Sequence, residues 1–483
     1  MKKIKILGTT ALLTLLLTVT ASAQVGKPFI HDPSTIAECD GKYYTFGTGR
    51  GGLISEDGWT WNSGGERPGG GVAPDVIKIG DRYYVTYAKG GGGMSGGHAS
   101  NVYVMWTKTL DPTSPDFGFK DETLVASSDG AEDCDAIDAA FLLDPTDGRL
   151  WLSYGTYFGY IRLVELDPKT GKRIEGNEAI NIAIDCEATA MMYRNGWYYL
   201  LGTHGTCCDG ANSTYNIVVG RSRSVTGPYL DNVGRDMLKG GGKMVVAAHD
   251  RVTGPGHFGL WDQGDGVQKM TCHYEADLDQ GGRSVLGILP LLWKNDWPVA
   301  GDNFKEGTYE IESERRGYAL ELVVDFVRMQ GGMRGFFGRN TDEPVKPVPS
   351  QELSDVIDTW PTGNIDVRIG DYMFRPHQKW TITAVPDAGG YPGGPYYKIV
   401  IAGTDRALAA TAEAEVITVP KFTGAPEQLW RIDQLTDGTY RIMPKVVPNS
   451  NEKYALVSSG DSTPTLAKFD FNSDNSKWNF KDH

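Results

Sequence analysis

A short phrase that joins a turn to a strand recurs through roughly the first 300 residues and constrains the fold more than any other feature. Its four copies start at Asp40, Gly80, Asp147 and Asn195. Asn-Gly and Asp-Gly favour tight hairpin turns, and the aromatic and β-branched residues that follow favour pleated strands. The copies lie about 40 to 70 residues apart, which is the interval of propeller blades. Together with a strand-rich stretch at 267–297, they predict a five-bladed β-propeller over residues 27–300. A β-sandwich with frequent turns is the alternative.

A different, threefold repeat occupies the C-terminal part. In each copy a Tyr-x-Ile segment precedes an Ala-Leu pair, and the copy ends on a tryptophan: Trp380, Trp430 or Trp478. The first copy is longer than the others by about 38 residues, and the polar, proline-bearing stretch 339–363 is the expected insertion. Three units ending in Gln-x-Trp, weaker in the third, resemble a ricin-type β-trefoil, a fold commonly used to bind sugars. The chain is therefore expected to be all-β, with the propeller followed by a β-trefoil over residues 305–483.

The N-terminus has the pattern of a signal peptide. Three lysines precede an apolar run that ends before Ala21-Ser22-Ala23, a cleavage pattern of small residues. The run is shorter than the about 20 residues of a membrane span. Residues 1–23 are therefore excluded from the fold, and the mature protein is expected to be exported, without membrane insertion, and a monomer. The formal net charge of −14 makes nucleic acid a poor partner.

Six cysteines are too few in a chain of this length for a disulfide-framework protein. Cys207 and Cys208 are adjacent, so they either form a strained disulfide with each other or pair separately. The sequence contains no C-x-x-C pair, so it gives no support to a zinc ribbon.

Separated carboxylates in the propeller segment suggest a site that cleaves glycosidic bonds. The inner strands of successive blades converge on one axis, so distant residues can share one depression. Inverting hydrolysis needs a carboxylate that activates water and a carboxylic acid of raised pKa. Asp32, held beside Pro33, is the candidate base, and Glu187, among small and apolar residues, is the candidate acid. Asp138 would help to keep Glu187 protonated, with Asp135 as the competing candidate. Turn aspartates and a solvent-facing glutamate are the alternative interpretations.

These residues resemble the corresponding positions of family 43 glycoside hydrolases, and most of all of arabinanases, over residues 27–300. Asp32, Asp138 and Glu187 match the family's base, pKa-modulating aspartate and acid, and the stretch 207–217 is also similar. Thr189 stands where arabinanases usually have proline. The resemblance implies a secreted, inverting hydrolase of α-1,5-L-arabinan or arabino-oligosaccharides, with the trefoil holding substrate nearby. An exo-acting α-L-arabinofuranosidase, β-xylosidase or galactosidase, or a non-catalytic carbohydrate-binding protein, is the alternative.

The resemblance also implies a residue for a cation, and other residues are candidates for binding sugar. His257 matches a histidine that faces a cation, often calcium, on the propeller axis, although calcium prefers oxygen ligands; a hydrogen-bonded core histidine is the alternative. The residues assigned to substrate binding are Trp106, Tyr157, Phe158, Asn212 and Ser213. The three aromatic residues are candidates because a ring face offers apolar area to a sugar, and most aromatic residues in such strands belong to the core.

Overall fold

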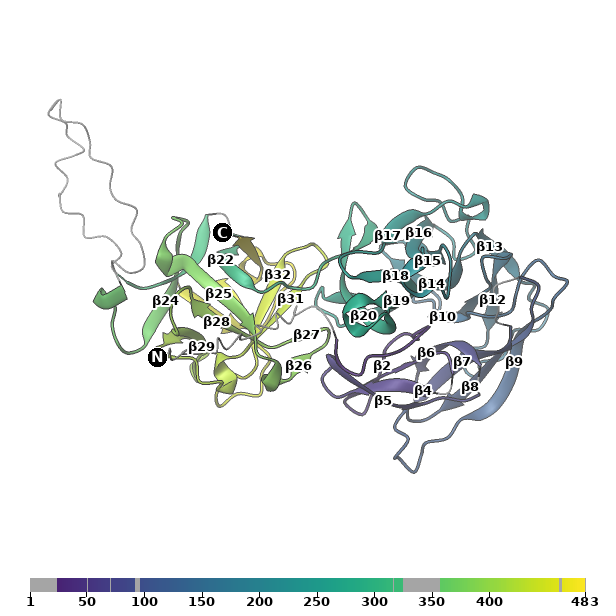
Figure 1. Cartoon of the computed structure of the whole chain (residues 1–483), viewed down its shortest axis with the longest axis horizontal. Coiled ribbons are helices and arrows are strands. Elements are labelled where there is room, and N and C mark those ends of the chain that lie inside the picture. The colour runs from purple at the N-terminus through teal and green to yellow at the C-terminus, as the bar shows by residue number, and fades with distance from the viewer. Residues whose placement is uncertain are drawn as a thin grey trace, which may run out of the picture.

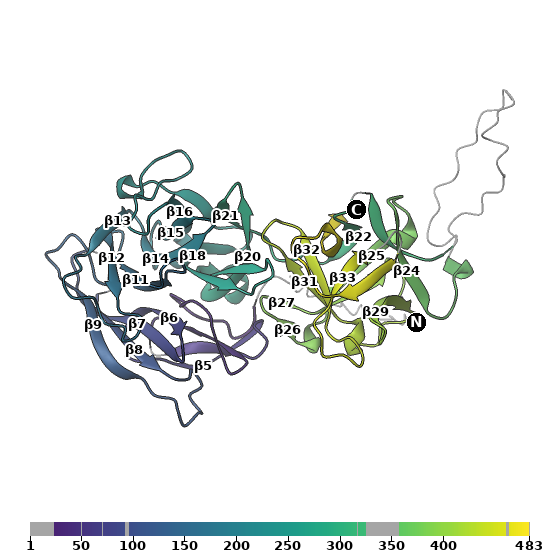
Figure 2. The same cartoon turned by 180° about the vertical axis from the view of Figure 1, so that it is seen from behind.

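The computed structural model describes residues 24–482, except residues 50, 70, 92–95, 316, 325–356 and 460–462. The predicted signal peptide and most of the predicted insertion at 339–363 lie outside the described residues. The described chain forms two lobes that lie side by side, a propeller and a trefoil, as seen from both faces of the molecule (Figures 1 and 2). Among the described residues, no helix is long and apolar enough to cross a membrane.

Five four-stranded blades build the first lobe, and in each blade the strands pair in chain order. Blade I has β2 (Ala37–Cys39), β3 (Lys42–Phe46), β4 (Gly51–Ser55) and β5 (Thr60–Glu66). Blade II has β6 (Val72–Ile79), β7 (Arg82–Gly90), β8 (Ala99–Thr107) and β9 (Lys120–Asp129). Blade III has β10 (Ala140–Leu143), β11 (Leu150–Tyr154), β12 (Tyr160–Leu166) and β13 (Ile180–Ile184). Blade IV has β14 (Glu187–Arg194), β15 (Trp197–His204), β16 (Asn216–Ser222) and β17 (Lys243–Val246). Blade V has β18 (Val252–Asp262), β19 (Gln268–Asp277), β20 (Arg283–Lys294) and β21 (Trp297–Ala300). The predicted propeller is confirmed, and the sandwich alternative is wrong.

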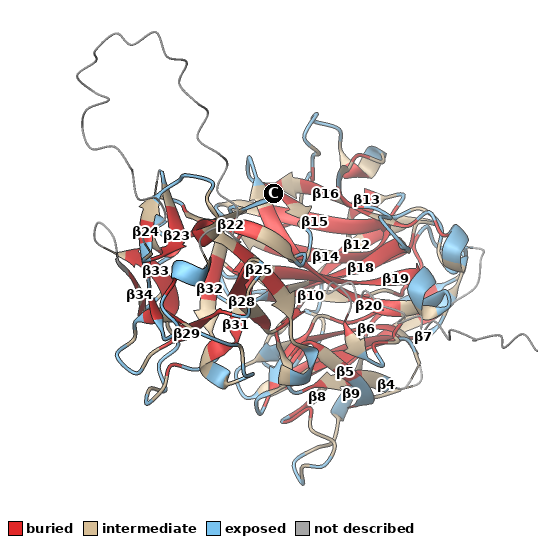
Figure 3. Ribbon diagram, turned by 60° about the vertical axis from the view of Figure 1, so that its left-hand side comes forward, coloured by how far each residue is buried: buried red, intermediate tan, exposed pale blue. Residues whose placement is uncertain are grey.

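The recurring turn phrase makes the first hairpin of a blade, as its chemistry predicts. At Asp40-Gly41 and Asn195-Gly196 both turn residues have positive φ, between 50° and 78°. That conformation is the one that Asn-Gly and Asp-Gly adopt at least cost. The turn residues therefore set the register of strands that are largely buried (Figure 3). Apolar side chains of neighbouring blades pack against one another in common clusters.

The N-terminal segment joins the first blade to the last. Strand β1 (Val25–Gly26) runs parallel to β5 at the edge of blade I. The amide of Leu286 in blade V donates to the carbonyl of Pro28 at 2.8 Å, and the Ser284 hydroxyl donates to the carbonyl of Ile30 at 2.7 Å. These bonds close the ring of blades immediately before Asp32.

The second lobe is a threefold β-trefoil, as predicted. Six strands close a barrel through successive antiparallel pairs: β22 (Gly307–Ser313), β25 (Lys379–Ala384), β28 (Tyr397–Ile401), β31 (Trp430–Gln434), β32 (Tyr440–Pro444) and β35 (Trp478–Asp482). Three hairpins complete the units: β23 (Tyr318–Leu322) with β24 (Ile365–Asp371), β29 (Ala407–Ala410) with β30 (Val416–Val419), and β33 (Ala455–Ser459) with β34 (Thr463–Ala467). A small hairpin joins β26 (Gly390–Tyr391) to β27 (Gly394–Pro395).

Short 3-10 helices occupy equivalent places in the trefoil units. Three of them precede the repeat tryptophans: η7 (Pro376–Gln378), η9 (Pro426–Gln428) and η10 (Asp474–Ser476). The others are η6 (Ile357–Thr359) and η8 (Pro386–Ala388) in the trefoil, and η1 (Gly210–Asn212), η2 (Met237–Lys239) and η3 (Leu278–Gln280) in the propeller.

The repeat tryptophans are core residues of the trefoil. All three are fully buried, and each indole Nε1 donates to the carbonyl of the leucine in its own Ala-Leu pair, at 2.8 to 3.0 Å. A buried indole needs such an acceptor. The Gln-x-Trp signature is therefore a feature of the trefoil core. Its tryptophans are buried and present no ring face to a sugar.

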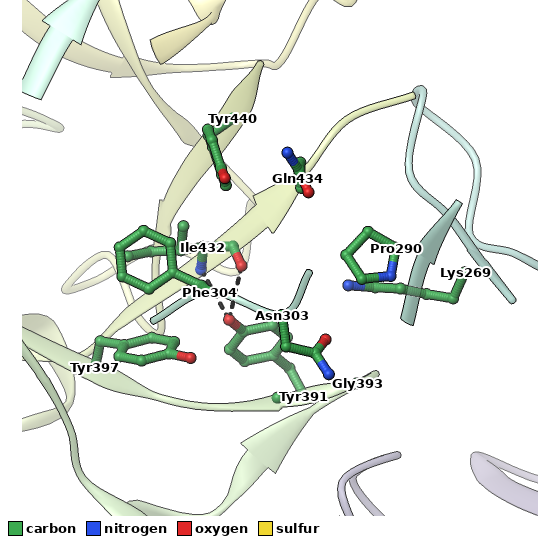
Figure 4. A pocket seen from close by; sticks show the side chains of 11 residues that line it. Lys269, Pro290, Asn303, Phe304, Tyr391, Gly393, Tyr397, Ile432, Gln434 and Tyr440 are labelled. Carbon is green, nitrogen blue, oxygen red and sulfur yellow. Dashed lines mark hydrogen bonds between the residues drawn. The ribbon is translucent and has the colours of Figure 1, made fainter. Parts of the chain in front are cut away.

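The two lobes meet at turns of blades I and V. The Trp293 amide donates to the Thr436 carbonyl and the Thr436 amide to the Gly266 carbonyl, both at 2.8 Å. Asp57 Oδ2 accepts from the Gly390 amide at 3.0 Å. Figure 4 shows the junction: Lys269 and Pro290 of the propeller face the trefoil residues across a small cavity.

A buried charge network strengthens this junction. Asp433 Oδ2 accepts from Arg431 Nε and Arg441 Nη2, both at 2.8 Å. Arg431 also donates to Gln263 of the propeller at 2.8 Å, and Arg441 approaches Asp265 at 3.7 Å. Burial lowers the pKa of Lys269 to about 8. The trefoil thus holds the propeller through fixed charges as well as main-chain bonds.

Candidate active site

Each blade contributes one polar side chain from its inner strand or from the segment that leads into that strand. These residues are Asp32, Asp75, Asp138, Glu187 and His257. The strand pairing is irregular at three of the five places, after Val72, after Glu187 and after Gly256. Asp32, Asp138 and His257 have left-handed φ values of 50°, 55° and 61°. Bulges and left-handed residues turn a side chain out of the pleat, so these five residues can direct polar groups toward the axis instead of into the blades.

Asp32 lies among three histidines. Its Oδ1 is 3.5 Å from His31 Nε2, 3.6 Å from His257 Nδ1 and 3.9 Å from His273 Nδ1. Thr48 donates its hydroxyl hydrogen to Oδ2. Burial alone would raise the pKa of Asp32, but the close approach of His257 and the charges of His31 and His257 hold that pKa far below its usual range. Asp32 is therefore ionised, as a general base must be.

Glu187 has the opposite character. It is buried, and burial is the main reason that its pKa rises to about 8; the nearby Asp32 and Glu275 carboxylates add to the rise. The hydroxyl of Tyr215 donates to Glu187 Oε1 and opposes part of the rise. Glu187 is therefore protonated at neutral pH, as a general acid must be.

Asp138 lies beside Glu187, and Asp135 does not act there. Burial, followed by the charges of Glu187 and Asp32, raises the pKa of Asp138 well above its usual range, and the amide of Ala188 donates to its carboxyl group. Asp135 instead accepts from the His98 amide at 2.9 Å and from the Thr156 hydroxyl at 3.3 Å. The geometry favours Asp138 over Asp135 as the neighbour of the acid. Its predicted effect on the pKa of Glu187 stays a prediction.

Asp75 is a buried residue near the site that was not predicted from the sequence. Its Oδ1 accepts from the Thr35 amide and its Oδ2 from the Phe141 amide, both at 3.0 Å. The side chain is buried, so it ties the segment after Asp32 to the segment after Asp138. The signal was available, because Ala73-Pro74-Asp75 opens the second inner strand as Ala136-Ile137-Asp138 precedes the third.

His257 is buried on the axis, and its amide donates to the Thr203 hydroxyl at 2.9 Å. Its Nδ1 has no hydrogen-bond partner and faces Asp32 at 3.6 Å, an ion-pair distance. Among the described residues, no group of three clustered ligand atoms includes His257. One ring nitrogen does not match the oxygen-rich set that calcium prefers. Calcium at His257 stays a prediction, which metal analysis of the purified protein checks.

Two clusters of potential metal ligands do include His31, but in each cluster other ligand atoms already form a bond or a hydrogen bond within the protein. One contains the sulfur atoms of Cys207 and Cys208, which form a disulfide with each other. The other contains His273, whose Nδ1 already accepts the amide of Asp32 at 3.1 Å. The adjacent disulfide settles the pairing that the sequence left open, and the other four cysteines are buried and free.

Trp106 lies at the end of blade II away from Asp75, and its predicted role in stacking on sugar stays a prediction. It pairs with Tyr84 near the end of β8, whereas Ala88, at the other end of β7, pairs with Val72 close to Asp75. Its Nε1 donates to Asp121 at 2.7 Å, and the Arg82 guanidinium covers its ring at 4.0 Å. The residue therefore stabilises the far end of blade II.

Tyr157 and Phe158 lie on the loop between β11 and β12, on the side of the site. Burial and the charge of Glu187 raise the pKa of Tyr157, and the Cys207 amide donates to its hydroxyl group. Phe158 is 41% exposed, and its ring meets those of Tyr157 and His98. Tyr157 therefore lies near Glu187, and sugar stacking by either ring stays a prediction.

Asn212 and Ser213 have different surroundings. Asn212 is exposed in η1. Ser213 is buried, donates to the Thr206 carbonyl at 2.8 Å and accepts from the Tyr215 amide at 3.2 Å. Ser213 therefore shapes the loop that carries Tyr215, whereas Asn212 remains free to contact substrate.

Comparison with known proteins agrees with this architecture. Residues 50–298 match "Glycosyl hydrolases family 43", and residues 376–471 match "Ricin-type beta-trefoil lectin domain-like". The chain is 33% identical over 304 residues to an extracellular exo-α-(1→5)-L-arabinofuranosidase, ArbA, of Cellvibrio japonicus (strain Ueda107), covering 56% of this chain and 85% of that protein. It is 34% identical over 230 residues to an extracellular endo-α-(1→5)-L-arabinanase of Bacillus subtilis (strain 168), covering 47% and 67%.

A solved structure supports the same comparison. The crystal structure of an exo-1,5-α-L-arabinanase from a bovine ruminal metagenomic library superposes with a TM-score of 0.52 at 32% identity. The superposition covers 57% of this chain and 97% of that one.

Proposed function

Because the chain belongs to glycosyl hydrolases family 43, we propose that it is an exported, inverting hydrolase of α-1,5-linked arabinan or arabino-oligosaccharides. One observation carries the proposal: two carboxyl groups at one end of the propeller axis have opposite pKa shifts. The pKa of Asp32 is lowered, and the pKa of Glu187 is raised to about 8. Carboxyl groups whose surroundings separate their pKa values are the signature of a base and an acid.

The two groups divide the reaction between them. Ionised Asp32 takes a proton from a water molecule while the oxygen of that water attacks the anomeric carbon. Glu187 gives its proton to the glycosidic oxygen as the bond between that oxygen and the anomeric carbon breaks. Each carboxyl group ends in the opposite protonation state, and exchange with solvent restores both.

The surroundings of each group keep it in its role. Tyr215 occupies Oε1 of Glu187 as a donor, so the proton of Glu187 sits on Oε2. Thr48 occupies Oδ2 of Asp32 as a donor, which leaves Oδ1 to accept the proton from water. Both hydrogen bonds therefore select which oxygen atom faces the substrate.

The sugar and the mode of attack are proposed from the relatives. The similar proteins are named for exo and for endo action on α-1,5-linked L-arabinose chains, so the exo-acting arabinofuranosidase is the second candidate. Both matched bacterial proteins are extracellular, which supports export of this one.

The trefoil is placed away from the acid and base. It contacts the turns after β4 and β18 and the end of β20, whereas Asp32 and Glu187 lie at the opposite strand ends. We therefore propose that the trefoil binds the polymer without contacting the acid and the base. We also propose that the protein acts as a monomer.

Product analysis tests the proposal. The mature protein, its Asp32→Asn variant and its Glu187→Gln variant are incubated with linear arabinan and with xylan and galactan oligosaccharides. Short arabino-oligosaccharides from the wild type alone indicate endo attack, and arabinose alone indicates exo attack. Turnover by either variant at the wild-type rate, or turnover of xylan or galactan only, contradicts the proposal. Proton magnetic resonance of the first product shows whether the anomeric configuration inverts.

A further inference from the structure

We propose that His273, with the Glu275 carboxylate beside it, is a positioning residue that holds Asp32 in the orientation of the general base. The inference rests on the proposed function, because it assigns Asp32 the role of base. It adds two residues to the site that neither take nor give a proton in the reaction.

The main chain of Asp32 binds directly to the His273 ring. The Asp32 amide donates to His273 Nδ1 at 3.1 Å, across 241 residues of sequence. His273 is completely buried in β19, the second strand of blade V. An imidazole nitrogen that accepts a hydrogen bond carries no hydrogen, so the proton of the neutral ring is on Nε2.

The Glu275 carboxylate is the charged group near that proton. Its Oε1 is 3.5 Å from His273 Nε2, a contact without hydrogen-bond geometry, and the same oxygen accepts the Cys208 amide at 3.1 Å. Glu275 is buried, and its contact with His273 and the bond from the Cys208 amide hold its pKa below the usual range against the effect of burial. A negative charge beside Nε2 favours the tautomer that carries its hydrogen there and leaves Nδ1 as an acceptor.

Asp32 needs this support because its backbone is strained. Its φ of 50° is left-handed, a conformation that residues other than glycine avoid. It also precedes Pro33, which disfavours helical conformations at the preceding residue. Such a conformation persists only where its surroundings determine it, and it is commonly found at active sites. The His273 ring supplies the acceptor that fixes it.

Fixing the amide also fixes the carboxylate. Asp32 Oδ1 lies between three imidazole rings at 3.5 to 3.9 Å, and a change in φ would move it away from all of them. The His31 ring packs against that of His273 at 4.4 Å, so His273 holds the second ring as well. We therefore expect His273 to affect the rate of the chemical step more than the binding of substrate.

Three variants of the full chain test the proposal. His273→Phe keeps a planar ring and removes the acceptor. His273→Asn keeps an acceptor oxygen near the position of Nδ1. His377→Phe is the matched control, because His377 is also fully buried and lies 3.2 Å from a buried carboxylate, Glu321, in the trefoil. Each variant is measured for kcat and KM on a linear α-1,5-arabino-oligosaccharide and for melting temperature.

The expected pattern separates positioning from folding. His273→Phe should lower kcat about tenfold, the factor that corresponds to one lost hydrogen bond, with KM changed by less than about twofold. His273→Asn should restore most of the lost kcat. His377→Phe should lower the melting temperature without lowering kcat.

Other results overturn the inference. A kcat for His273→Phe equal to that of the wild type would exclude a positioning role. Equal loss in His273→Phe and His273→Asn, tracking the melting temperature, would show that His273 only stabilises the fold. Failure of the proposed function is distinguishable, because Asp32→Asn would then retain turnover whatever the His273 variants do.

Discussion

The hydroxyl of Tyr215 donates its hydrogen bond to Oε1 of Glu187, and both side chains are buried. Burial and the neighbouring carboxylates, Glu187 first among them, raise the pKa of Tyr215 far above its usual range, so the phenol keeps its proton and remains a donor. A donor stabilises the charged form of a carboxyl group. Tyr215 therefore limits how far the pKa of Glu187 rises, and it fixes the carboxyl group in place.

Replacement of Tyr215 by phenylalanine tests this balance. Without the donor, the pKa of Glu187 should rise above about 8, so activity should persist to higher pH. At the optimum, kcat should fall about tenfold, because the acid loses the bond that orients it. The pH dependence of kcat measures both effects. A basic limb at the wild-type position would show that Tyr215 does not control the acid.

Replacement of Glu187 by glutamine should abolish turnover and also change the pH dependence of stability. The folded-state pKa of Glu187 is raised, to about 8, above the unfolded value of about 4.3. The stabilisation by protonated Glu187 is therefore complete below about pH 4.3 and is lost as the pH rises through about 8. Glutamine does not titrate, so the melting temperature of the variant should rise relative to that of the wild type between about pH 5 and 9. A constant difference across that range would contradict the raised pKa.

The repeats made the fold predictable, because their information is local. Asp40-Gly41 and Asn195-Gly196 specify turns from two residues, and the turns then set the strands. Asp32, Asp138 and Glu187 could be selected as candidates, because each stands in a distinctive neighbourhood at or before an inner strand, and their catalytic roles stay predictions. In these cases a short segment contains enough chemistry to indicate its place.

The partners of these groups were not predictable, because their contacts join residues that are far apart in the sequence, in two of three cases from different blades. Asp32 meets His273 across 241 residues, Phe141 meets Asp75 across 66, and Tyr215 meets Glu187 across 28. The position of Trp106 was not predictable for a related reason. Its sequence identifies a strand residue, but only the register with Tyr84 shows that it lies at the far end of the blade.

Replacement of Asp75 by asparagine should weaken both the fold and catalysis. The amide oxygen can accept from only one of the Thr35 and Phe141 amides, and the amide nitrogen would face the other donor. The expected loss is about 1 to 3 kcal/mol in the free energy of unfolding, with a lower kcat because the segments after Asp32 and Asp138 move. Denaturant unfolding and steady-state kinetics measure the two effects.

Asp144 supplies the control for Asp75. It is also buried and accepts from the Thr146 amide at 2.9 Å and the Tyr198 hydroxyl at 2.8 Å. Asp144→Asn should reduce stability without reducing kcat. Equal effects of the two substitutions on kcat would mean that Asp75 has no particular relation to the site.

Replacement of Asp433 by asparagine should loosen the junction between the lobes. The substitution leaves the buried Arg441 and the half-buried Arg431 without their shared carboxylate, and breaking a buried network costs about 3 to 5 kcal/mol. Burial would raise the pKa of Asp433, but the two arginines and Lys269 lower it well below its usual range. The stabilisation by ionised Asp433 is therefore present above the unfolded pKa and is lost as the pH falls through the lower folded value. The difference in unfolding free energy between variant and wild type should therefore shrink in acid.

Asp437→Asn is the control. It affects a partly exposed pair with Lys477 at 2.7 Å and should cost less than about 1 kcal/mol. Hydrogen exchange at the Trp293 and Thr436 amides should accelerate in Asp433→Asn alone, and unchanged exchange there would show that the main-chain bonds hold the lobes together without the charges.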